Sequence, residues 1–104
     1  MHLDMHITEH NIKEIQQLCS ESKVKSLYAF GSVTRADFNE SSDIDWVVDS
    51  VERDPFIYTD LYFQLKEKFE ELFHRPIDLI EERAINNRFF RQHLDKTKVL
   101  IYGH

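Results

Sequence analysis

Glycine and cysteine are both scarce in this chain of 104 residues. The only glycines are Gly31 and Gly103, and each is informative because glycine is favoured where φ is positive or where a ligand approaches the backbone. Gly103 is expected to lie in a frayed end, which leaves Gly31 as the glycine inside the fold. The single cysteine, Cys19, cannot form an intramolecular disulfide and is typical of a reducing compartment.

The sequence also lacks the hallmarks of membrane, secreted and nucleic-acid-binding proteins. No apolar run approaches the ~18 residues of a transmembrane helix. The N-terminus has no basic region followed by an apolar stretch, as a signal peptide would have. The formal net charge is −6 and the lysines and arginines are scattered, which argues against neutralisation of nucleic-acid phosphates. We therefore expect a cytoplasmic protein without a membrane or direct nucleic-acid partner.

The chain does contain a regular succession of amphipathic and β-rich segments. Helices are expected over residues 8–21, 56–74 and 85–94, and strands over 24–30, 43–49, 76–80 and 98–102. The long helix has the clearest pattern, because its apolar residues recur every three or four positions. The order α-β-β-α-β-α-β predicts an α/β (α+β) fold, a mixed β-sheet with the helices packed on one side. At this length we expect a single domain over residues 1–104.

Two aspartates stand at the start of the second expected strand. Asp43 and Asp45 are two residues apart, so their side chains share one face of a strand, with Cα atoms ~6–7 Å apart. Ile44 and Trp46 are then expected to enter the core on the other face. Two neighbouring carboxylates repel one another unless a cation lies between them. Mg²⁺ suits such a pair, because it binds one or two protein carboxylates and leaves its other positions to water and phosphate oxygens.

Two further segments complete a candidate site. Gly31 and Ser32 close the first expected strand, where a phosphate can approach the glycine and accept hydrogen bonds from the serine and the following amides. Asp78 lies in the short third strand, and three carboxylates converge if that strand pairs beside the strand of Asp43 and Asp45. Taken singly, an Asp-x-Asp strand is also typical of an exposed polar face, and Ser32 of a helix N-cap.

The spacing of these residues resembles the motif of the nucleotidyltransferase superfamily typified by DNA polymerase β. That motif is an apolar residue and Gly-Ser, here Phe30-Gly31-Ser32, then about ten residues, Asp-x-Asp and a later acid. The chain is most similar to the minimal nucleotidyltransferase (MNT) group, whose members are often paired with HEPN-domain toxins. The resemblance covers nearly the whole chain.

The resemblance implies a role for each motif residue. The catalytic and metal-binding residues would be Asp43, Asp45 and Asp78, which would hold one or two Mg²⁺ ions. The nucleotide-binding residues would be Gly31, Ser32 and Arg35, which would contact a nucleoside triphosphate. One departure from the MNT pattern is that Ala36, rather than glycine, follows Arg35.

The resemblance also implies a reaction and a partner. AMP would be transferred from ATP to a hydroxyl, and the acceptor would be a tyrosine of a partner HEPN toxin, which makes this chain an antitoxin. The acidic net charge favours a protein acceptor over a nucleic acid. Two alternatives stay open: a non-catalytic antitoxin that neutralises its partner by occlusion, and a nucleotidyltransferase for small molecules such as aminoglycosides.

Aromatic residues exceed what one helix face requires. The chain has 8 Phe, 4 Tyr and 1 Trp, and Phe89 and Phe90 are adjacent, so that both cannot face the same way. The surplus is consistent either with a partner surface or with a well-packed core and ordinary exposure.

Overall fold

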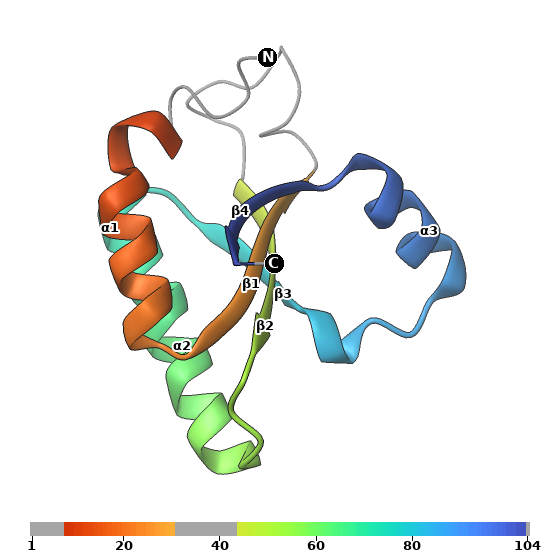
Figure 1. The fold of residues 1–104 in the computed structure, drawn as a ribbon, viewed down its shortest axis with the longest axis horizontal. Helices are drawn as coiled ribbons and strands as arrows, with labels where there is room; N and C mark the ends of the chain where they lie inside the picture. The colour runs from red at the N-terminus through yellow and green to blue at the C-terminus, as the bar shows by residue number, and fades with distance from the viewer. Residues whose placement is uncertain (1–7, 31–43, 104) are drawn as a thin grey trace.

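The computed structural model describes residues 8–30 and 44–103, and its elements follow the expected order (Figure 1). They are α1 Thr8–Glu21, β1 Val24–Phe30, β2 Ile44–Ser50, α2 Pro55–Phe73, β3 Ile77–Glu81, the 3-10 helix η2 Glu82–Ala84, α3 Arg88–Thr97 and β4 Val99–Gly103. The largest departure is α3, which begins and ends three residues later than expected. Asn87 explains the later start, because its side chain accepts a hydrogen bond from the Phe90 amide at 2.9 Å and caps the helix there.

The four strands form one mixed sheet in the order β3-β2-β1-β4. β1 runs antiparallel to both of its neighbours, whereas β2 and β3 are parallel. α1 and α2 cover one face of the sheet, and α3 lies on the opposite side (Figure 1). The mixed sheet is therefore confirmed, but α3 departs from the expected arrangement with every helix on one side.

The direction of the chain crossovers explains the position of α3. The connection through α2 moves from β2 outward to β3, whereas the connection through α3 returns across the sheet from β3 to β4. Crossovers between parallel strands are almost always right-handed. Two crossovers of one hand that run in opposite directions must use opposite faces, so the strand order decides which face α3 covers. That order cannot be read from the periodicity of the sequence.

The core lies between the sheet and the pair α1 and α2. Trp46 of β2 is fully buried and meets the ring of Phe69 edge to face, with centroids 4.8 Å apart. Deleting a buried aromatic side chain of this kind typically costs about 3–5 kcal/mol. Cys19 of α1 joins the same core, and burial raises the pKa of its thiol to about 12. Within the two described ranges, no helix is long and apolar enough to cross a membrane.

Within residues 8–30 and 44–103, three positions take a left-handed backbone conformation. Lys23, after α1, and His74, after α2, have φ values of 59° and 56°, so each helix ends in a left-handed residue without using glycine. Gly103 has φ of 87°, and a Cβ atom there would lie 2.0 Å from the carbonyl oxygen of Lys25. The expectation that Gly103 lies in a frayed end is therefore wrong: it is a paired residue of β4, opposite Ser26, at a close approach of two backbones.

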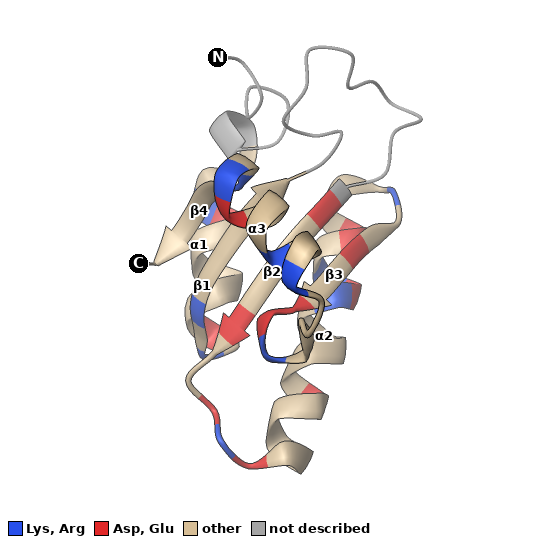
Figure 2. Ribbon diagram, turned by 90° about the vertical axis from the view of Figure 1, so that its right-hand side faces the viewer, with Lys and Arg blue, Asp and Glu red and all other residues tan. Residues whose placement is uncertain are grey.

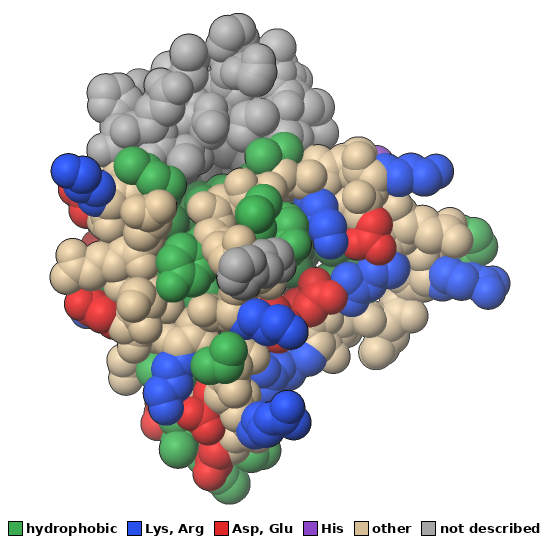
Figure 3. All heavy atoms as spheres, in the orientation of Figure 1, with side chains coloured by type: hydrophobic (Ala, Val, Ile, Leu, Met, Phe, Trp, Pro, Cys, Tyr) green, Lys and Arg blue, Asp and Glu red, His purple; other side chains and the backbone are tan. Residues whose placement is uncertain are grey.

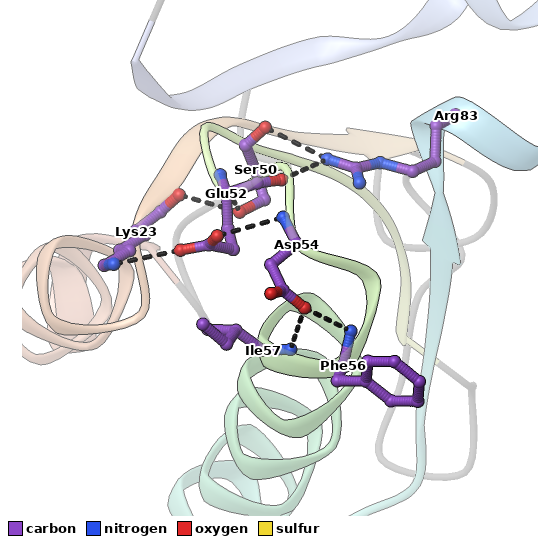
Figure 4. A network of polar contacts seen from close by, with 7 residues as sticks. All are labelled: Lys23, Ser50, Glu52, Asp54, Phe56, Ile57 and Arg83. Carbon is purple, nitrogen blue, oxygen red and sulfur yellow. Dashed lines mark hydrogen bonds and ion pairs between the residues drawn. The ribbon is translucent and has the colours of Figure 1, made fainter.

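A network of polar contacts closes the end of the sheet where β2 leads into α2 (Figure 4). Glu52 accepts hydrogen bonds from Lys23 Nζ at 2.9 Å and from the Asp54 amide at 3.0 Å. Asp54 in turn caps α2 by accepting from the Phe56 amide at 2.9 Å. Arg83 Nη2 donates to the Ser50 and Glu52 carbonyl oxygens, both at 3.2 Å. These contacts join the α1–β1 turn, the β2–α2 loop and η2 into one unit.

Candidate active site

The carboxylate pair of this site lies on neighbouring parallel strands. Asp45 of β2 is the register partner of Asp78 of β3, so the two residues stand side by side across one strand spacing, ~4.8 Å. The next residues in each strand, Trp46 and Leu79, are buried in the core. Because side chains alternate along a strand, both aspartates point to the sheet face away from α1 and α2. Figure 2 shows acidic segments side by side on β2 and β3. The two strands are therefore paired, which is the condition that the sequence set for the carboxylates of Asp45 and Asp78 to lie together.

Contacts from α2 fix the strand that carries Asp78. Glu70 Oε2 accepts hydrogen bonds from the Ile77 amide at 3.1 Å and from Lys66 Nζ at 2.8 Å. These two contacts, that of Lys66 foremost, lower the pKa of the Glu70 carboxyl below its ordinary value. On the other side of Asp78, the Tyr62 hydroxyl donates to the carbonyl oxygen of Leu79. β3 is thus held at the residues before and after Asp78, while the Asp78 side chain itself is exposed.

Phe30 extends the row of the two aspartates by one strand. It is the antiparallel register partner of Asp45, so its side chain lies on the same face of the sheet. Its ring meets the ring of Phe90 from α3, with centroids 5.9 Å apart and planes at 76°. The row Asp78, Asp45, Phe30, Phe90 therefore joins two carboxylates to two aromatic rings. Sequence analysis assigned no site role to Phe90, and its only signal there was the adjacent aromatic pair Phe89 and Phe90.

The remaining predicted site residues lie outside the described ranges. Gly31, Ser32, Arg35 and Asp43 all fall between β1 and β2, and their roles stay predictions. Among the residues that the structure does describe, no three acids, histidines or cysteines form a metal-binding group. The pair Asp45 and Asp78 still fits Mg²⁺, because hard carboxylate oxygens on adjacent strands match the one or two protein ligands that this ion takes.

A hollow of about 540 Å³ lies away from the carboxylates, at the other end of β2. Its lining includes Asp49, Glu52 and Arg83, and these charges already have partners within the protein. Arg83 lies 3.9 Å from Asp49 and its guanidinium stacks 3.7 Å from the ring centroid of Tyr58. Since these groups serve the fold, the carboxylate row is the better candidate for chemistry.

Comparison with known proteins assigns the class of protein that carries this site. The family "Polymerase beta, Nucleotidyltransferase" matches residues 13–104. Two proteins of Methanocaldococcus jannaschii, both assigned as protein adenylyltransferases, are 30% and 32% identical to the chain; each match covers 86% of this chain and 94% of the relative. The chain belongs to the polymerase beta nucleotidyltransferase family and is a nucleotidyltransferase.

Solved structures show the same fold. A minimal nucleotidyltransferase superimposes on this chain with a TM-score of 0.73 and 23% identity, over 95% of each chain. A toxin–antitoxin complex with AMP-PNP contains a chain with a TM-score of 0.69 and 22% identity, over 90% of this chain and 74% of the other. A complex of tri-AMPylated Shewanella oneidensis HEPN toxin with MNT antitoxin gives 0.64 and 20%, over 94% and 74%.

Proposed function

We propose that this chain is an Mg²⁺-dependent adenylyltransferase that transfers AMP from ATP to a hydroxyl of a HEPN-domain toxin and thereby acts as its antitoxin. The observation that carries the proposal is the placement of Asp45 beside Asp78 on neighbouring parallel strands. The polymerase beta nucleotidyltransferase family supports the reaction class. The AMPylated toxin bound to an MNT antitoxin, a fold relative of this chain, supports the partner and the transferred group.

The catalytic residues in this proposal are Asp43, Asp45 and Asp78. The acceptor oxygen forms a bond to the α-phosphorus of ATP while the bond from that phosphorus to the β-phosphate oxygen breaks and pyrophosphate leaves. Asp43 and Asp45 would hold the metal, and the exposed Asp78 would contribute a further ligand or accept the proton of the acceptor hydroxyl. Bound Mg²⁺ supplies the charge stabilisation that phosphoryl groups require in such a displacement. Gly31, Ser32 and Arg35 would contact the triphosphate.

The acceptor is a protein side chain in this proposal, and a tyrosine hydroxyl is the specific target. The acidic charge of the chain, −6, disfavours a nucleic-acid acceptor, since the phosphates would be repelled. The protein adenylyltransferase assignment of the archaeal relatives points to the same acceptor class.

Transfer of label from α-³²P-ATP tests the proposal. The protein is incubated with Mg²⁺, labelled ATP and a candidate HEPN-domain partner, and label is expected on a tyrosine of the toxin together with release of pyrophosphate. Asp45→Asn and Asp78→Asn should each abolish transfer. Asp60→Asn, on the exposed face of α2, is the matched control and should leave transfer intact.

Three outcomes would contradict the proposal. Neutralisation of the toxin without any label would indicate occlusion. Label on an added aminoglycoside and none on the toxin would indicate a small-molecule enzyme. Transfer that survives the double substitution of Asp45 and Asp78 would remove these carboxylates from the mechanism.

A further inference from the structure

The aromatic rings beside the carboxylates are the feature that the proposed chemistry leaves unused. Phe30 lies one strand spacing, ~4.8 Å, from Asp45, and the ring of Phe90 from α3 lies 5.9 Å from the Phe30 ring, between centroids. Both side chains are only partly buried, so each keeps a surface that another molecule can contact. The row therefore changes from charged to apolar within the span of a few side chains.

The packing of α3 holds the ring of Phe90 against that of Phe30 in the protein without a ligand, and we call these two rings the aromatic wall. Leu94, one turn after Phe90, is fully buried. Arg91, the next residue, forms an ion pair with Glu82 of η2, with Nη1 and Oε2 2.6 Å apart. Asn87 caps the helix at the Phe90 amide. Figure 3 shows mainly basic side chains over α3, with an acidic patch beside them. The ring of Phe90 is thus held on a rigid element, which reduces the entropy that binding would cost.

We propose that Phe30 and Phe90 form the subsite for the nucleobase of the nucleoside triphosphate. This inference rests on the proposed function, in which Asp45 and Asp78 mark the phosphate end of the substrate. In a nucleotide, one ribose separates the charged phosphates from a flat, largely apolar base. The row in the protein likewise changes from a charged end, at the carboxylates, to an apolar end, at the rings. Aromatic side chains contact any base through its face, so the subsite binds a base without reading its hydrogen-bonding edge.

The wall also suits an aromatic acceptor, but the base is the better occupant. Phe30 is the direct neighbour of Asp45 within the sheet, so the wall adjoins the metal-binding side of the pair. Asp78 lies beyond Asp45, at the edge strand of the sheet, and it is the exposed member of the row. An acceptor that approaches from solvent therefore meets Asp78 first, at the side of the row opposite to the rings.

Equilibrium binding to the intact protein tests the subsite without requiring turnover. Dissociation constants are measured with Mg²⁺ for AMP-PNP and for inorganic tripolyphosphate, which has the phosphates but no base. Phe90→Ala should weaken AMP-PNP binding by about tenfold, as expected for loss of one base-stacking side chain. It should leave tripolyphosphate binding unchanged. Phe90→Tyr should retain AMP-PNP affinity, and GMP-PNP should follow AMP-PNP across the variants.

Phe89→Ala is the matched control, because Phe89 is the adjacent phenylalanine of α3 and is 74% exposed. It should leave both affinities unchanged. The inference is overturned if Phe90→Ala weakens both ligands equally, if it weakens neither, or if it raises only the KM for the acceptor protein. Failure of the proposed function looks different: wild-type protein would then bind neither ligand, or Asp45→Asn would leave both affinities unchanged.

Discussion

The two ends of the sheet handle charge in opposite ways. Where β2 ends, charged and polar groups of the network in Figure 4 bind one another: Glu52 with Lys23, and Arg83 with the Ser50 and Glu52 carbonyls. Where β2 begins, Asp45 and Asp78 bring two like charges side by side. The exposed Asp78 carboxylate accepts no hydrogen bond from the described residues, although Lys66 contributes a favourable field.

This contrast separates groups that stabilise the fold from the carboxylates to which the proposed function gives a ligand. Like charges on adjacent strands destabilise a sheet slightly, whereas a capped and cross-linked loop stabilises it. Substitutions at the two ends should therefore have opposite effects: loss of activity without loss of stability where β2 begins, and loss of stability without loss of chemistry where it ends.

Asp78→Asn gives the largest effect expected at the carboxylate end. Loss of this carboxylate should reduce the rate of AMP transfer by about a thousandfold, since charge stabilisation at a metal site is worth several kcal/mol. The melting temperature should stay level or rise slightly, because the repulsion from Asp45 is relieved. Rate measurements with labelled ATP and thermal melts of the same preparation check both halves. A large drop in melting temperature would show that Asp78 stabilises the fold, and the proposed difference between the two ends of the sheet would then be wrong.

Arg83→Ala should give the largest loss of stability at the opposite end. The substitution removes two hydrogen bonds to backbone carbonyls and the contact of the guanidinium with the Tyr58 ring, at 3.7 Å. For this partly exposed side chain we expect about 1–2 kcal/mol of destabilisation. Denaturant titration measures it, and Arg83→Lys is the informative partner, because it keeps the charge but not the planar fork. Equal stability of the lysine variant and the wild type would show that charge alone matters here.

Asp54→Ala removes the N-cap of α2. Its side chain accepts hydrogen bonds from the Phe56 and Ile57 amides at 2.9 and 3.3 Å. The expected cost is about 1 kcal/mol, which lowers the melting temperature by roughly 4–8 °C. Transfer activity at a temperature well below the transition should stay unchanged. Asp60→Ala, within the same helix, controls for the loss of a negative charge and should melt close to the wild type.

The sequence predicted part of the carboxylate end of the sheet and nothing of the polar network at the other end. Alternation of side chains along a strand predicted the face that Asp45 takes, but it left the meeting of Asp45 and Asp78 conditional on the pairing of their two strands. The place of Phe90 beside Phe30 could not be predicted in the same way. It depends on which face α3 covers, and that follows from the strand order rather than from local periodicity. The role of Gly103 was missed because the close approach that excludes a side chain there comes from the Lys25 backbone, far away in the sequence.

The smallest expected effect is a pH dependence that comes from Glu52. Its hydrogen bonds from the Asp54 amide and from Lys23 lower the pKa of the carboxyl below its ordinary value of 4.5 in the folded protein. The protonated form is thus disfavoured by folding, so this stabilisation is fully present above pH 4.5 and is lost as the pH falls through the folded-state pKa. Melting temperatures of wild type and Glu52→Gln should therefore differ at neutral pH and converge in acid. Because the side chain of its partner Lys23 is 54% exposed, the difference should also shrink in high salt. A difference in melting temperature that stays constant across this pH range would show that Glu52→Gln acts through packing or hydrogen-bond geometry and not through the lost charge. The network at this end would then depend on the shape of the side chain more than on its ionisation.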